Sequence, residues 1–109
     1  ENAARLSYGL AFAKYTGSRG KAMANDADAE FIQEIRQIFD KNEIKYQSGG
    51  FGKVDEGGGG TVAKFLAYYG IRTIDAGPAL LSMHSLFEIS SKADLYETYR
   101  AYKVFFELN

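Results

Sequence analysis

The chain has 109 residues, with 13 Lys and Arg, 14 Asp and Glu, one His and neither Cys nor Trp. This length predicts a single domain, and 46% apolar with 25% charged residues is typical of a globular protein. Without Cys there is no disulfide framework, thiol nucleophile or cysteine metal cluster, and a reducing, cytoplasmic location fits. A net charge of −1 argues against nucleic acid as a partner, and no apolar run reaches the ~20 residues that span a membrane.

The first half of the chain predicts a strand, a helix and a second strand. Residues 6–14 alternate in the manner of a strand, and the glycine-containing segment after them predicts a loop. Residues 27–41 predict a helix with Asn25 or Asp26 as its N-cap, and residues 44–47 predict a short strand. The helix is expected to bury one stripe with a 3.6-residue period, made of Phe31, Ile35, Ile38 and Phe39.

The second half predicts a helix, two strands and a last helix. Residues 61–69 predict a short helix, residues 71–76 a strand that the Gly-Pro pair at 77–78 breaks, and residues 79–83 another short strand. The last helix is expected at about residues 92–107. The order β-α-β-α-β-β-α favours an α/β fold with a mixed sheet and flanking helices.

The last helix also predicts its own start and its own buried side. Ser91 and Asp94 have the spacing of a capping box, in which the Ser side chain accepts from the backbone N–H three residues on. The buried stripe expected from the apolar spacing is Leu95, Tyr99, Tyr102 and Phe106.

The glycine run before the short helix is the first candidate site. Backbone N–H groups at residues 57–61, without side chains in the way, would suit an anion or a substrate backbone. The spacing does not match a Walker phosphate loop or a dinucleotide fingerprint. A flexible turn that lets two elements pack closely explains the same residues.

His84 is the second candidate, because it follows an apolar strand and ligand sites in α/β domains form beyond strand ends. A hydrogen-bonded structural role or a surface position is the alternative. Metal sites need three or four ligands, and carboxylates are the only companions that this chain offers. Glu88 and Asp75 border the same region, where either could orient a metal-bound His, cap a helix or stay a surface charge.

Several motifs together resemble a known family. Residues 14–21 (KYTGSRGK), 25–27 (NDA), 52–66 (GKVDEGGGGTVAKFL), 81–88 (LSMHSLFE) and 91–94 (SKAD) are similar to the aminopeptidase I family of zinc metallopeptidases. This family also contains the aspartyl aminopeptidases. The resemblance covers nearly the whole chain, in order and at compatible spacing.

The resemblance implies that residues 1–109 are the C-terminal portion of a dinuclear zinc exopeptidase catalytic domain. His84 then resembles the family's last metal ligand, and the chain holds no catalytic residue of its own. The general base, the other ligands and an inserted lid and dimerisation domain would lie before Glu1. That the chain begins with Glu1 and not Met fits processing or cutting from something longer.

The resemblance further implies a zinc-dependent aminopeptidase that acts on peptides, with two zinc ions that cobalt or manganese can replace. Members assemble as homo-oligomers, from dimers to dodecamers. The 109-residue chain alone is expected to be inactive. A free-standing α/β module that holds an anion at the Gly57–Thr61 helix start is the alternative. The residues expected to border the substrate are Gly58, Gly59, Gly60, Thr61, Ser82 and Met83.

Overall fold

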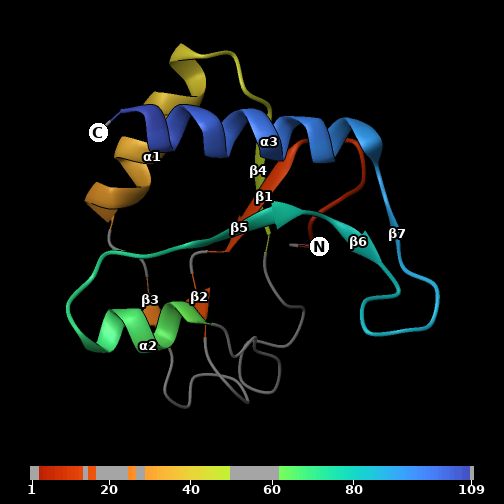
Figure 1. Ribbon diagram of the computed structural model, residues 1–109, viewed down its shortest axis with the longest axis horizontal. Helices are drawn as coiled ribbons and strands as arrows, with labels where there is room; N and C mark the ends of the chain where they lie inside the picture. The colour runs from red at the N-terminus through yellow and green to blue at the C-terminus, as the bar shows by residue number, and fades with distance from the viewer. Residues whose placement is uncertain (1–2, 14, 17–24, 27–28, 50–61, 109) are drawn as a thin grey trace.

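The computed structural model describes residues 3–13, 15–16, 25–26, 29–49 and 62–108 and shows a mixed α/β fold (Figure 1). The elements in chain order are β1 (Leu10–Ala13), β2 (Tyr15–Thr16), β3 (Asn25–Asp26), α1 (Ala29–Lys41), β4 (Tyr46–Ser48), α2 (Val62–Tyr68), β5 (Asp75–Pro78), β6 (Leu80–Leu81), β7 (Ile89–Ser90) and α3 (Lys92–Glu107). This confirms the predicted fold class and element order, to which the structure adds the two-residue strands β2, β3 and β7. No helix among the described residues has the length and apolar character needed to cross a membrane.

The main sheet has three strands in the order β4-β1-β5, with β1 in the centre. β1 runs parallel to β4, with Leu10 opposite Tyr46, and antiparallel to β5, with Leu10 opposite Pro78. The sheet is therefore mixed, as predicted. The short strands form two separate antiparallel pairs, β2 with β3 and β6 with β7.

β5 continues through Gly77 and Pro78, so the predicted break at this pair is wrong. The backbone N–H of Leu10 donates to the carbonyl of Lys45 at 3.1 Å, which turns the polar groups of Leu10 toward β4. Leu10 and Pro78 are thus a non-hydrogen-bonded pair of the antiparallel ladder. Because β5 is also an edge strand, the N–H that Pro lacks costs no bond in the sheet.

The predicted N-cap of α1 is also wrong. Asn25 and Asp26 form β3, in which Asp26 pairs with Tyr15 and Asn25 with Thr16, and the helix begins only at Ala29. Local cap preference is a weak signal, and here strand pairing takes up the backbone of these two residues.

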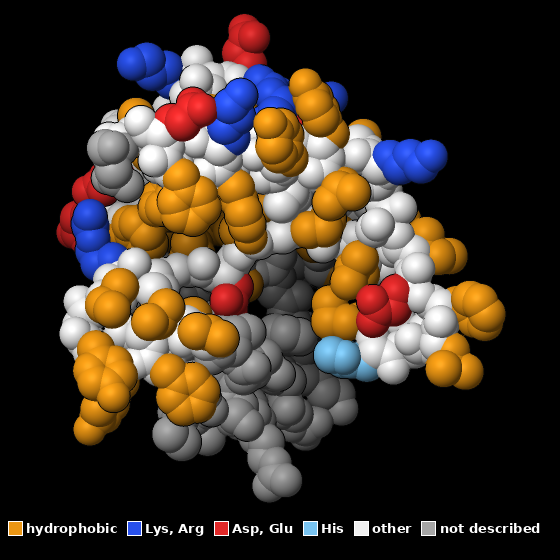
Figure 2. All heavy atoms as spheres, in the orientation of Figure 1, with side chains coloured by type: hydrophobic (Ala, Val, Ile, Leu, Met, Phe, Trp, Pro, Cys, Tyr) orange, Lys and Arg blue, Asp and Glu red, His pale blue; other side chains and the backbone are white. Residues whose placement is uncertain are grey.

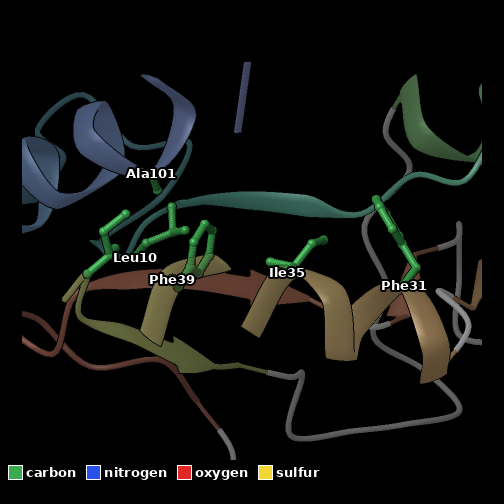
Figure 3. Close-up of a cluster of buried hydrophobic side chains, with 6 residues drawn as sticks. Leu10, Phe31, Ile35, Phe39 and Ala101 are labelled. Atoms are coloured by element: carbon green, nitrogen blue, oxygen red, sulfur yellow. The ribbon is translucent and has the colours of Figure 1, made fainter. Parts of the chain in front are cut away.

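The core lies between β1, α1 and α3, and Figure 3 shows side chains of all three converging. Leu10 of β1 and Ala101 of α3 are fully buried. The predicted stripe of α1 is confirmed, because three of its residues are buried and Ile38 packs against the cluster while half-buried. The buried members of the cluster are Leu10, Phe31, Ile35, Phe39, Ile44 and Ala101.

α3 buries a different side from the predicted one. Its buried residues are Asp94, Thr98 and Ala101, spaced by four and three positions. The four residues of the predicted stripe are between 46% and 68% exposed. The small side chains of Thr98 and Ala101 let α3 approach the sheet closely. Thr98 can be buried there because its Oγ1 donates to the Asp94 carbonyl at 2.8 Å and so needs no hydrogen bond to water. Tyr102 sits at the edge of this contact, where its hydroxyl donates to the carbonyl of Ala76 in β5.

Candidate functional site

His84 lies in the connection between β6 and β7, which we call the His84 loop (residues 82–88). β6 and β7 form a hairpin in which Leu81 pairs with Ile89, and Figure 1 shows this hairpin extending away from the main sheet. The predicted strand at 79–83 is shorter than expected and ends at Leu81. His84 therefore does follow a strand, but that strand belongs to a separate two-stranded ribbon and not to the main sheet.

The backbone of the His84 loop is held in an uncommon conformation. Ser82 has φ +59° and His84 has φ +68°, both in the left-handed region. Each non-glycine residue there costs about 1–2 kcal/mol, so the surrounding contacts must stabilise the loop. A turn closes the first half of the loop, because the N–H of Ser85 donates to the carbonyl of Ser82 at 3.0 Å.

Ser85 fixes the second half of the loop through its side chain. Its hydroxyl donates to the carbonyl of Phe87 at 2.8 Å and lies 3.2 Å from the N–H of the same residue, which donates to it. Both backbone groups of Phe87 are thereby engaged although its side chain is exposed. Hydrogen bonds therefore hold both the turn at Ser82 and the chain just before β7.

The imidazole of His84 is exposed and open to a ligand. Figure 2 shows it in pale blue on the surface, among hydrophobic side chains and beside an acidic one. Among the described residues, the hydrogen bond that involves His84 runs through its backbone N–H, which donates to a carboxylate oxygen of Glu88. No described residue bonds to either ring nitrogen, and a neutral imidazole nitrogen is a common zinc ligand.

Of the two carboxylates predicted near His84, only Glu88 lies in the His84 loop, whereas Asp75 lies in β5. Glu88 does contact His84, but at the backbone and not at the ring. Asp75 starts β5, opposite Ala13, at the far end of that strand from the hairpin. The sequence pattern indicated a carboxylate near the histidine, yet only the structure shows that it supports the loop backbone.

The described residues alone do not assemble a metal site. They contain no group of three or more His, Cys, Asp or Glu side chains that could hold a metal ion. A zinc ion requires three or four ligands, so a zinc ion bound by His84 would need its other ligands from groups outside the described residues.

The residues predicted to border the substrate divide into two groups. Ser82 and Met83 lie in the His84 loop directly before the histidine, and the Met83 side chain is 59% exposed. They can therefore contact whatever His84 binds. The other four, Gly58, Gly59, Gly60 and Thr61, lie outside the described residues.

The surface around the histidine is apolar. Leu86 is 96% exposed, and Phe87 beside it is also exposed. The flanking residues Leu81, Met83 and Ile89 add to this surface. Exposed hydrophobic side chains that gather on one loop are typical of a surface that another group covers.

A separate apolar cavity of about 440 Å³ lies between the helices and the sheet. Its walls come from β1, α1, α2, the segment leading into β5, and α3, and include Phe12, Phe31, Leu66 and Phe105. No residue of the His84 loop lines it. The cavity is therefore not the place where a ligand of His84 would sit.

Comparison with known proteins gives consistent matches. The family model described as Aminopeptidase I zinc metalloprotease (M18) matches residues 1–106. A probable M18 family aminopeptidase 1 from Borreliella afzelii (strain PKo) is 62% identical over 107 residues, which is 98% of this chain and 23% of that protein.

Solved structures agree with the sequence matches. The crystal structure of an M18 family aminopeptidase from Thermotoga maritima has a TM-score of 0.87 and 57% identity, covering 94% of this chain and 23% of that one. Aminopeptidase I from Clostridium acetobutylicum also gives a TM-score of 0.87, with 55% identity over 95% of this chain and 23% of its own. The chain thus spans less than a quarter of the length of these relatives.

Proposed function

Because the chain belongs to the aminopeptidase I zinc metalloprotease family (M18), we propose that it forms the part of a zinc-dependent aminopeptidase that contributes the metal ligand His84. The observation that carries this proposal is the exposed imidazole of His84, whose neighbours bond only to its backbone. A histidine that served the core would be buried, whereas His84 is exposed at the tip of a hairpin.

The chemistry that this chain contributes is the placement of one nitrogen donor. A ring nitrogen of His84 would hold zinc, and bound zinc supplies an activated water and a Lewis acid for the peptide carbonyl. Ser82 and Met83 would flank the substrate beside the metal, with the exposed apolar side chain of Met83 against it. Gly58, Gly59, Gly60 and Thr61 would border the substrate as well.

The complete protein would release N-terminal amino acids from peptides. In that proposal two zinc ions occupy the site, cobalt or manganese can replace them, and the protein works as a cytoplasmic homo-oligomer. The remaining ligands and the general base would come from outside these 109 residues, so the chain by itself would be inactive. No observation on the described residues favours the alternative of a free-standing anion-binding module, because the glycine run lies outside them.

The test is the variant His84→Ala in the complete protein that contains this chain. Loss of one ligand should lower the zinc content measured by mass spectrometry of metals and abolish most hydrolysis of an aminoacyl-anilide. Lys103→Ala is the control, since it removes an exposed side chain of α3 and leaves the His84 loop unchanged. Full activity with full zinc occupancy in His84→Ala would refute the proposal.

A further inference from the structure

Glu88 lies at a point of the His84 loop where the backbone is held on both sides. It directly precedes β7, whose Ile89 pairs with Leu81 of β6. On its other side Ser85 engages both backbone groups of Phe87. The backbone of Glu88 is therefore tied on both sides, although the loop around it is exposed.

From this anchored position the Glu88 side chain reaches back across the loop. One carboxylate oxygen accepts a hydrogen bond from the backbone N–H of His84, four residues earlier. A bond from an N–H to a charged acceptor is worth about 1.5–3 kcal/mol when it is well formed. That range is comparable to the cost of the left-handed backbone at His84, so Glu88 can hold a conformation that the residue itself disfavours.

We propose that Glu88 is a positioning residue for His84. By holding the backbone N–H in this turn, Glu88 restrains the backbone that sets the direction of the Cα–Cβ bond of His84. This inference rests on the proposed function, in which the ring of His84 binds zinc.

The arrangement differs from the common one, in which a carboxylate bonds the ring N–H of a metal-binding histidine. Here the carboxylate acts on the main chain and leaves both ring nitrogens open. One nitrogen is then available for zinc and the other for a second group.

The test compares Glu88→Ala with Glu88→Gln in the complete protein, with zinc affinity measured by competition with a chromogenic chelator. Removal of a group that supports a metal ligand typically lowers the metal affinity about 10- to 100-fold, and we expect Glu88→Ala to fall in this range. Gln keeps an oxygen that can accept from the His84 N–H, so it should stay within a few-fold of wild type. Glu107→Ala, which removes an exposed glutamate of α3, is the matched control and should not change the affinity.

A second measurement does not involve zinc. In the metal-free protein, hydrogen-exchange mass spectrometry of a peptide covering residues 82–88 should show the fastest exchange in Glu88→Ala and an intermediate rate in Glu88→Gln, whose neutral amide oxygen is a weaker acceptor. Replacing Ser82 by Gly in the Glu88→Ala background removes the left-handed cost at one of the two strained residues and should recover part of the zinc affinity. Thermal unfolding curves of all variants show whether each one is folded.

Two results would overturn the positioning role. One is a Glu88→Ala protein that binds zinc as tightly as wild type, and the other is a Glu88→Gln protein that is as weak as Glu88→Ala. If His84→Ala lowers zinc content while Glu88→Ala does not, the positioning role alone fails. If His84→Ala also leaves zinc content unchanged, the proposed function fails with it.

Discussion

Asp94 Oδ1 accepts a hydrogen bond from the backbone N–H of Gly9 at 2.9 Å, across 85 positions of sequence. The other carboxylate oxygen accepts from the N–H of Ser7 at 2.7 Å. Asp94 is only 1% exposed, so its charge is compensated by these two backbone donors. The first turn of α3 thereby clamps the segment that leads into β1.

We predict that Asp94→Ala destabilises the complete protein by about 3 kcal/mol, because it leaves two donors without their charged acceptor. Asp94→Asn should lose less, since its amide oxygen can still accept from one of the two N–H groups. The measurement is the denaturation midpoint in urea for both variants. Equal midpoints for wild type and Asp94→Ala would show that the clamp does not contribute to stability.

Substitution of three glycines by Ala separates the cost of backbone strain from the cost of a steric clash. At Gly9 an added Cβ would lie 2.3 Å from the Lys45 carbonyl oxygen, and φ is +94°. Gly70 has φ +79° but open space around it, whereas Gly77 has open space and no positive φ.

The expected order of destabilisation on substitution by Ala is therefore Gly9, then Gly70, then Gly77. Gly70→Ala should cost about 1 kcal/mol through backbone strain alone, and Gly77→Ala should be close to neutral. Gly9→Ala should cost clearly more, since β1 and β4 would have to separate at Lys45. Thermal unfolding of the three variants checks this order, and a Gly9→Ala protein as stable as Gly77→Ala would contradict it.

The purified 109-residue chain should not hydrolyse aminoacyl-anilides in the presence of added zinc. The described residues offer no group of three metal-binding side chains, and a single imidazole holds zinc weakly. Release of the anilide chromophore above the rate of a His84→Ala sample of the same chain would show that the chain carries a catalytic centre of its own.

Ser85→Ala should loosen the His84 loop without altering a ligand. The substitution removes both contacts between the Ser85 hydroxyl and the backbone of Phe87, so the segment before Glu88 loses one of its two anchors. We expect a few-fold loss of zinc affinity in the complete protein, smaller than that of Glu88→Ala. A loss larger than that of Glu88→Ala would place the main support of the loop at Ser85.

Periodicity predicted α1 correctly because its buried side is its apolar side. It misplaced the buried side of α3, where Asp94 and Thr98 are buried through hydrogen bonds and the residues of the predicted stripe are exposed. Hydrophobic spacing has no means of recognising a polar contact face whose partners, Ser7 and Gly9, are more than 80 positions away. The predicted break of β5 at its Gly-Pro pair is wrong for a related reason. Only the sheet order reveals that Pro78 lies on an edge strand, where a missing N–H costs no bond.

At the candidate site, the sequence motif indicated His84 and its neighbours Ser82 and Met83, and the structure places all three in one exposed loop. The role of Glu88 did not follow from the motif, because spacing alone does not distinguish a bond to the ring from a bond to the backbone. The left-handed conformation of Ser82 and His84 also did not follow from the sequence, since Ser does not signal it and His adopts it only somewhat more often than most residues.

The most direct test of the account is a crystal structure of the complete protein grown with zinc, with anomalous data collected on both sides of the zinc absorption edge. We expect an anomalous peak about 2.0–2.1 Å from a ring nitrogen of His84, with the Glu88 carboxylate still bonded to the His84 N–H. A fully occupied zinc site with the His84 ring turned away from it would contradict the account.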